Sequence, residues 1–142
     1  MKLNRLALTL LALLVLTPAQ GSTTRMVGVQ FRGCYDGDTC YFDFPRVRPA
    51  MFGQDRPVRL LGIDAPEIKG DCPGEIQAAE QARDALVAKL QKARRIVIDT
   101  PGLDKYHRIL GRVTADGLDL SAWMIRRGLA REYQGSHRSG WC

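Results

Sequence analysis

The sequence is poor in the residues that bind transition metals. It has two histidines and four cysteines among 142 residues, with neither a C-x-x-C pair nor a clustered pair of histidines. Structural zinc sites take four such ligands at short spacings, so the sequence argues against one. Low-complexity runs and internal repeats are absent too. With 45% hydrophobic and 25% charged residues, the chain has the composition of a soluble globular protein, and its length suits one domain.

The sequence also lacks an apolar run long enough to cross a bilayer. The longest run, at 6–16, is shorter than the roughly 20 residues of a membrane span, which argues against an anchor. It follows Lys2 and Arg5 and precedes the small-residue sequence T-P-A at 17–19. This order is typical of a cleaved secretory signal peptide.

The predicted signal peptide divides the chain into three parts: the signal at 1–19, a flexible leader at 20–26 and a folded domain at 27–142. No cysteine lies near the cleavage point, which argues against a lipoprotein signal. We therefore expect a secreted or periplasmic protein that has no membrane attachment after the signal is removed.

The predicted export of the protein suggests that its cysteines form disulfides. In an oxidising compartment, an even number of cysteines suggests disulfides, and the four here would form two. Three pairings are possible, and the sequence does not choose among them. We favour Cys34–Cys40 with Cys72–Cys142, since the second bridge would tie the end of the chain to its body.

Basic residues outnumber acidic ones. The net charge is +6, or +4 once Lys2 and Arg5 are removed with the signal. A basic soluble protein favours polyanions such as nucleic acids, because bound phosphates release counterions. This is a general tendency and identifies no particular partner.

Apolar periodicity divides the folded part into strands and helices. Short or alternating apolar runs predict strands at 27–31, 40–44, 58–63, 95–99 and 109–113. Spacings of three and four residues predict a long helix at 73–92. A short helix follows at 120–127, with Asp119 as its N-cap and Gly128 beyond its end. This order favours an α+β domain built on a small antiparallel barrel.

Three short motifs carry candidate chemistry: D-G-D-T at 36–39, R-L-L-G-I-D-A-P-E at 59–67 and D-K-Y-H-R at 104–108. Each alone has an ordinary explanation as a turn, a loop or a solvated charge. Together they supply carboxylates, which hold hard divalent cations, and two arginines, whose guanidinium groups fork onto phosphate oxygens. A further carboxylate can take a proton from water. Metal-assisted attack of water on a phosphodiester needs this combination.

In this order and at this spacing, the three motifs resemble those of the staphylococcal nuclease (thermonuclease) family, over about 31–133. The resemblance implies a five-stranded OB-type β-barrel with one long and one short flanking helix, compatible with the order of elements above. It also implies a secreted bacterial member of the family that lacks the last helix, with the polar tail at 136–142 in its place.

The resemblance assigns roles to individual residues. It implies that Ca²⁺ is held by the side chains of Asp38 and Asp64 and by the main-chain carbonyl of Ala65. Glu67 would be the general base for the attacking water. The other implied roles are a clamp on the scissile phosphate for Arg59 and Arg108, contacts to a terminal phosphate for Lys105 and Tyr106, and support of the metal ligands for Asp36.

The implied function is calcium-dependent hydrolysis of DNA and RNA with low sequence specificity. The 5′ P–O bond would be cleaved, leaving 3′-phosphates, by a monomer without a stable protein partner. Two alternatives are a nucleic-acid-binding OB-type module that has lost catalysis and a disulfide-stapled extracellular interaction domain. The presence of all five charged residues implied to act in catalysis and metal binding favours the enzyme.

Two positions depart from the family pattern. Ala65 stands where the family usually has threonine, which keeps a main-chain ligand but removes a hydroxyl. His107 stands where the family usually has glycine, and a positive φ there is less favourable for histidine than for glycine.

Overall fold

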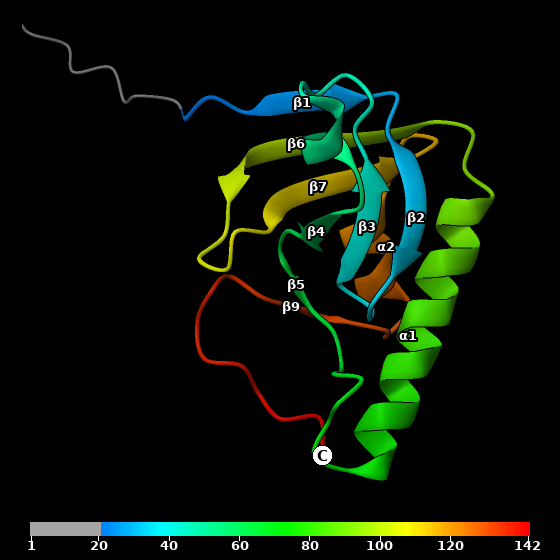
Figure 1. The fold of residues 1–142 in the computed structure, drawn as a ribbon. Coiled ribbons are helices and arrows are strands. Elements are labelled where there is room, and N and C mark those ends of the chain that lie inside the picture. Colours follow the sequence, from blue (N-terminus) through cyan, green and yellow to red (C-terminus); the bar gives the residue numbers. More distant parts are fainter. Residues whose placement is uncertain (1–20) are drawn as a thin grey trace, which may run out of the picture.

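The computed structural model describes residues 21–142, which form an open, twisted sheet flanked by two helices (Figure 1). The predicted signal peptide at 1–19 lies outside these residues. The strands are β1 (Thr24–Val27), β2 (Gln30–Cys34), β3 (Thr39–Asp43), β4 (Arg56–Leu60), β5 (Ile63–Asp64), β6 (Ile96–Leu103), β7 (Ile109–Ala115), β8 (Leu118–Asp119) and β9 (Arg131–Glu132). The helices are α1 (Pro73–Gln91), α2 (Leu120–Arg126) and the short 3₁₀ helix η1 (Ala50–Gly53).

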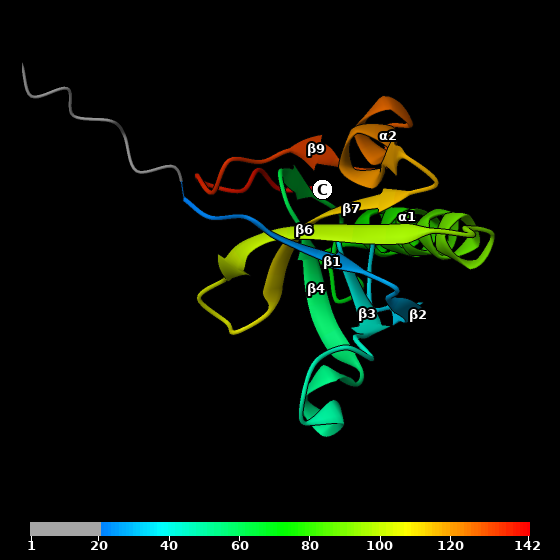
Figure 2. The same cartoon turned by 90° about the horizontal axis from the view of Figure 1, so that it is seen from above.

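The main sheet has the strand order β1-β6-β7-β4-β3-β2, with β8 added beside β7. Its neighbours are antiparallel except β4 and β7, which run parallel and place Arg59 opposite Leu110. The two short strands β5 and β9 form a separate antiparallel pair. Figure 1 shows β5 and β9 side by side, with the chain end farther down near the start of α1, and Figure 2 shows β9 beside α2. The order brings the three sequence motifs to neighbouring strands.

The long helix α1 buries one stripe of its surface against the sheet. Its residues Ala79, Ala82, Leu86 and Leu90 recur at three- and four-residue steps and are fully or almost fully buried. Pro73 occupies the first helical turn, where its missing N–H is not needed. Each buried leucine contributes about 1.5–3 kcal/mol of hydrophobic stabilisation. The sequence predicted this helix to within one residue.

The short helix α2 has the caps that the sequence predicted. The Asp119 side chain accepts the main-chain N–H of Ala122 at 3.1 Å, which satisfies one donor of the first turn. Gly128 has a φ of 67°, the left-handed conformation that commonly ends a helix. Between the caps, Leu120 and Met124 point into the core.

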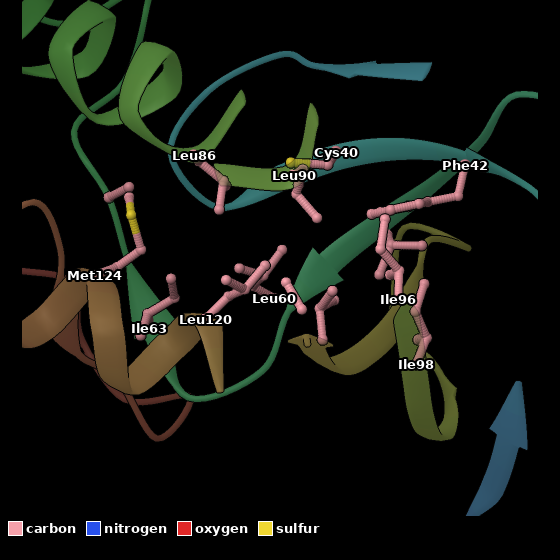
Figure 3. Packing of buried hydrophobic residues seen from close by; sticks show 14 of the residues in the cluster. Cys40, Phe42, Leu60, Ile63, Leu86, Leu90, Ile96, Ile98, Leu120 and Met124 are labelled. Atoms are coloured by element: carbon pink, nitrogen blue, oxygen red, sulfur yellow. The ribbon is translucent and has the colours of Figure 1, made fainter. Parts of the chain in front are cut away.

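A single core fills the space between the sheet and the two helices (Figure 3). It draws on every major element, so the strands that carry the motifs are fixed against the helices. Its largest fully buried side chains are those of Phe42, Val58, Leu60, Ile63, Leu86, Leu90, Ile98, Val113, Leu120 and Met124.

The α+β class and an OB-type arrangement with one long and one short helix agree with the sequence prediction. The predicted barrel needs correction, because the sheet is not closed and contains seven strands in the described part of the chain. The predicted strand at 27–31 is in fact two strands, β1 and β2. The first of them overlaps the segment predicted as a leader at 20–26, where Arg25 forms two hydrogen bonds to Asp99 of β6, at 2.7 and 3.1 Å.

Both favoured disulfides are present, Cys34–Cys40 across the turn between β2 and β3 and Cys72–Cys142 between the start of α1 and the chain end. The described residues include no free cysteine. Two disulfides are compatible with an extracellular location. Within residues 21–142, none of the helices has the length and hydrophobicity of a transmembrane segment.

Candidate active site

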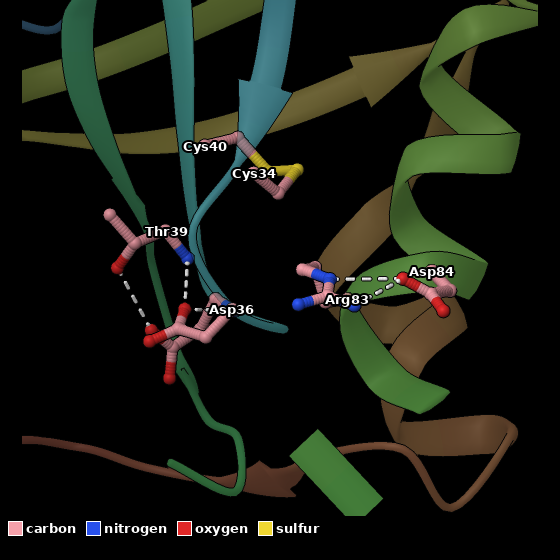
Figure 4. Close-up of a disulfide and its surroundings, with 7 residues drawn as sticks. Cys34, Asp36, Thr39, Cys40, Arg83 and Asp84 are labelled. Atoms are coloured by element: carbon pink, nitrogen blue, oxygen red, sulfur yellow. Dashed lines mark hydrogen bonds and ion pairs between the residues drawn. A yellow bond between two sulfur atoms is a disulfide. The ribbon is translucent and has the colours of Figure 1, made fainter. Parts of the chain in front are cut away.

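The D-G-D-T motif forms the tight turn between β2 and β3. Asp36 Oδ1 accepts the main-chain N–H groups of Asp38 at 3.0 Å and Thr39 at 2.8 Å, and Figure 4 shows Asp36 beside Thr39 below the Cys34–Cys40 disulfide. Burial, aided by the nearby Asp38 charge, raises the pKa of Asp36 to about 7. Asp36 therefore shapes the turn that positions Asp38.

Gly37 fits this turn tightly against the rest of the molecule. A Cβ atom at this position would lie 2.7 Å from the Cβ of Ala82 on α1 and 2.8 Å from the Cβ of Ala65. Distances this short do not occur between real side chains, so any other residue would push the turn away. The glycine thus allows the first motif to approach the second.

The first two motifs meet through Asp38. Its Oδ2 accepts the main-chain N–H of Ala65 at 2.8 Å, and its Oδ1 accepts the Thr39 hydroxyl at 3.1 Å. Arg59 Nη2 lies 3.2 Å from Asp38 Oδ2 and 3.9 Å from Asp64 Oδ1. All three side chains are buried. The two acids and the guanidinium between them therefore form a buried charged cluster.

The third motif supplies a second arginine next to this cluster. In the loop between β6 and β7, Asp104 Oδ1 accepts the N–H groups of Tyr106 at 2.8 Å and Arg108 at 3.0 Å. Asp104 Oδ2 accepts Arg108 Nε at 2.7 Å, and Arg108 Nη1 reaches the Thr39 hydroxyl at 3.4 Å. Burial opposes ionisation of Asp104, but the hydrogen bonds from Arg108 and Tyr106 lower its pKa.

The other two residues predicted to bind substrate lie on the same loop. Lys105 Nζ is 5.0 Å from the centre of the Tyr106 ring, and Arg108 Cζ is 5.4 Å from it. Tyr106 as a whole is 66% exposed, so a ligand can reach its side chain. His107, which replaces the family's usual glycine, has a φ of 63°, so this loop does require a left-handed residue.

A cleft of about 640 Å³ joins these groups. Arg59, Lys105, Tyr106 and Arg108 all line it, as does Arg138 from the tail. The carboxylates of Asp38, Asp64 and Glu67 are not among its lining residues. They lie behind two arginines of the cleft wall, because Arg59 pairs with Asp38, and Arg138 pairs with Asp64 and Glu67. The cleft wall is therefore rich in guanidinium groups, as an anion-binding cleft would be.

Glu67 is part of a loop that the buried acid Glu75 holds in place. Glu75 Oε1 accepts the Glu67 N–H at 3.2 Å, and Glu75 Oε2 accepts the Asp71 N–H at 2.9 Å. The Glu67 side chain remains 40% exposed and pairs with Arg138 at 2.7 Å. The structure thus brings the predicted base close to Asp64, which pairs with the same arginine.

The donor groups suit a hard cation. No cluster of three or more His, Cys, Asp or Glu side chains arranged to hold a metal occurs in residues 21–142. The ligand set implied by the resemblance, two carboxylates and the Ala65 carbonyl, needs only two such side chains, since water and phosphate oxygens can complete a calcium shell. In the structure, the carboxylates of Asp64 and Glu67 already form ion pairs with one positive group, the Arg138 guanidinium. The chemistry of these residues therefore fits Ca²⁺.

Comparison with known proteins identifies the family. Residues 57–140, more than half of the chain, match the model of the staphylococcal nuclease homologue family. The chain belongs to this family. Membership supports a nuclease-like hydrolase acting on nucleic acids, in line with a cleft that contains several arginines. A search of curated proteins gave no significant match.

The region that matches the staphylococcal nuclease homologues begins after Asp36 and Asp38. These two acids are tied to the matched region by their own contacts, since Asp36 forms the turn that carries Asp38 and Asp38 accepts the Ala65 N–H. These contacts hold Asp38 next to Ala65 and near Asp64, which both lie within the matched region. The acids before the matched region and those inside it therefore belong to one site.

Sequence reasoning missed two residues of this nuclease homologue's site. Glu75 was overlooked, although a glutamate three residues after the position preceding a predicted helix commonly accepts main-chain N–H groups. Arg138 was overlooked because it lies in a polar tail without periodicity. The one available signal was its position four residues before Cys142. A disulfide from Cys142 to Cys72 brings this part of the chain back to the folded domain.

Proposed function

We propose that this protein is an exported, calcium-dependent nuclease that hydrolyses phosphodiester bonds of DNA and RNA with little sequence preference. The observation that carries the proposal is the position of Arg59. Its guanidinium contacts Asp38 and lies near Asp64, and the same side chain lines the cleft that contains Arg108. Groups suited to a cation and groups suited to a phosphate are therefore adjacent, as metal-assisted phosphodiester hydrolysis requires.

In the proposed reaction, Arg59 and Arg108 donate hydrogen bonds to the non-bridging oxygens of the scissile phosphate. Negative charge grows on these oxygens as water attacks, so fixed donors stabilise the transition state more than the ground state. Asp104 fixes the Arg108 guanidinium through the 2.7 Å hydrogen bond from its Nε. Apart from the 3.4 Å contact of Nη1 with the Thr39 hydroxyl, the terminal nitrogens then remain to contact substrate. A calcium ion on Asp38, Asp64 and the Ala65 carbonyl would polarise a phosphoryl oxygen.

The proposed chemistry balances as a simple hydrolysis. Glu67 takes a proton from water while the water oxygen bonds to phosphorus. The bond from phosphorus to the 5′ oxygen breaks, that oxygen takes a proton from solvent water, and Glu67 returns its own proton to the solvent. The products are a 3′-phosphate and a 5′-hydroxyl. Lys105 and Tyr106, which line the cleft, are proposed to hold a terminal phosphate of the substrate.

The substrate is proposed to be single-stranded or locally unpaired. OB-type folds bind strands whose bases are splayed out and stacked on aromatic side chains, and the exposed Tyr106 ring offers such a surface next to two cations, Lys105 and Arg108. We propose that the enzyme works as a monomer, since the implied catalytic and metal-binding residues all belong to one chain.

A gel assay tests the proposal. The protein without residues 1–19 is incubated with denatured DNA in the presence of Ca²⁺ or of a chelator. Degradation with Ca²⁺ alone is expected, and Glu67→Gln and Arg108→Ala proteins purified in the same way should show little of it. If these variants degrade DNA like the wild type, a contaminating nuclease is responsible and the proposal fails.

One observation favours the second candidate, a binding module without catalysis. Arg138 pairs with both Asp64 and Glu67, and an arginine held there permanently would block a cation and the proposed base. This alternative predicts a salt-sensitive mobility shift of single-stranded DNA with no degradation at any Ca²⁺ concentration.

A further inference from the structure

The last ten residues return across the site and are anchored at both ends. At the start, β9 pairs with β5, where Arg131 lies opposite Asp64. At the end, Cys142 is joined to Cys72, the residue before α1. Figure 1 shows this segment (red) running from β9 to the first turn of α1. The segment from 133 to 142, here called the tail, thus forms a strap that starts beside Asp64.

Two side chains of the tail, Arg138 and Trp141, make three hydrogen bonds to the acids of the site. Arg138 Nε donates to Asp64 Oδ1 at 2.5 Å, and its Nη2 donates to Glu67 Oε1 at 2.7 Å. The Trp141 indole N–H donates to Asp64 Oδ2 at 3.2 Å. Donors from the tail therefore use both carboxylate oxygens of Asp64. Because the Asp64 side chain is only 7% exposed, little of it remains for any other partner while these contacts persist.

The tail is also held by contacts away from the carboxylates. The Arg131 guanidinium lies 3.7 Å from the centre of the Trp141 ring, a stacked cation–π arrangement. Arg131 Nη1 donates to the Gly140 carbonyl at 3.0 Å. These contacts and the disulfide keep Arg138 close to its partners at a high effective concentration, so its competition with a free ion is intramolecular.

We propose that Arg138 is an internal competitor for the cation site: its tethered guanidinium occupies Asp64 and Glu67, and a divalent cation must displace it to bind. The inference rests on the proposed function in one respect, that Asp64 ligates Ca²⁺. A calcium–oxygen bond of about 2.3–2.6 Å and a guanidinium hydrogen bond to the same oxygen bring two positive groups into near contact. The two occupants therefore exclude each other, and Arg138 sets the Ca²⁺ concentration at which the enzyme becomes active.

The competition has to be reciprocal. If Arg138 weakens the binding of Ca²⁺, then Ca²⁺ weakens the contacts of the tail by the same factor. The hydrogen bond from Trp141 to Asp64 would be lost with them, which changes the surroundings of the indole. The emission of Trp141 therefore reports displacement of the tail without any measurement of catalysis. In a Trp123→Phe protein, Trp141 is the only tryptophan of the sequence.

The test is the Ca²⁺ affinity of the full mature protein, measured by titration calorimetry. Arg138→Ala is expected to lower the dissociation constant about tenfold. Arg138→Lys keeps the charge without the two-pronged contact and should fall between Arg138→Ala and the wild type. Arg126→Ala, on an exposed position of α2, removes the same charge away from the site and should leave the affinity unchanged.

The second readout is a Ca²⁺ titration of Trp123→Phe followed by fluorescence. The emission of Trp141 should change and saturate at the same concentrations as the heat of binding. Equal, measurable affinity of wild type and Arg138→Ala, or weaker binding by the variant, would overturn the competition and leave the proposed function standing. If neither protein binds Ca²⁺, the proposed function fails, and the inference fails with it.

Discussion

Asp38 accepts the main-chain N–H of Ala65 at 2.8 Å, and this single hydrogen bond joins the turn after β2 to the end of β5. The two residues are 27 positions apart in the sequence. The bond orients one carboxylate oxygen toward Arg59 and holds Asp38 beside Asp64. Asp38 thus has a structural role as well as its proposed role as a metal ligand, and the two roles are separable.

Substitutions at Asp38 should separate these roles. Asp38→Ala leaves the buried Ala65 N–H without an acceptor, which typically costs about 1–3 kcal/mol, whereas Asp38→Asn keeps an acceptor oxygen and should cost less. Both should lose Ca²⁺ binding, since each removes the anionic ligand. Urea unfolding gives the first quantity and calorimetry the second. An alanine variant as stable as the wild type would contradict the structural role.

Arg59→Lys should lower kcat by about 10²–10³-fold, the usual cost of removing one donor to developing negative charge. Lysine keeps the charge but lacks the planar fork that fits a phosphate. Arg83→Lys is the matched control, because Arg83 pairs with Asp84 on the surface of α1 (Figure 4) and is not part of the cleft. Turnover close to normal in Arg59→Lys, measured on single-stranded DNA, would rule out the clamp role.

Asp104→Ala should weaken catalysis through Arg108. The variant removes the acceptor of Arg108 Nε and of two main-chain N–H groups in the loop, so the guanidinium loses its fixed orientation. Misplacement of a positioned group by about 1 Å can cost as much as 10²-fold, and we expect a loss of that order in kcat. Since Asp104 acts through another residue, Asp104→Asn should restore part of the activity. A normal rate in Asp104→Ala would show that Arg108 needs no such support.

Stability should depend on pH through Asp36. Its pKa is raised from 3.8 to about 7, so between these values the folded protein binds more protons than the unfolded chain. The free energy of unfolding contributed by Asp36 therefore falls as the pH rises from about 4 to about 7. Asp36→Asn should lack this slope in chelator-treated protein. A difference between wild type and variant that stays constant over this range would refute the raised pKa.

The sequence predicted best what depends on local spacing. The stripe from Ala79 to Leu90 specified α1, and the Asp119 and Gly128 caps specified α2. The three motifs were found because each is short, and their convergence followed from the family resemblance. Their contacts through Asp38 and Thr39 required the fold itself, because these contacts join separate strands.

Long-range relationships were beyond local patterns. No periodicity marks the tail, and the Arg138–Asp64 contact spans 74 positions. The extent of the sheet was misjudged for a similar reason, since β1 is held by its pairing with β6 and by Arg25, and not by a pattern of its own. The role of Glu75 was missed because it accepts N–H groups from an irregular loop, whose path has no repeating sequence pattern.

The most direct test of the account is the single-turnover rate of cleavage of a single-stranded DNA oligonucleotide, measured as the Ca²⁺ concentration is raised. We predict no cleavage in a chelator, a rate that rises and saturates with Ca²⁺, fragments ending in 3′-phosphates, and no cleavage by Asp64→Asn at any Ca²⁺ concentration. Cleavage that persists in a chelator, or that Asp64→Asn performs at the wild-type rate, would contradict it.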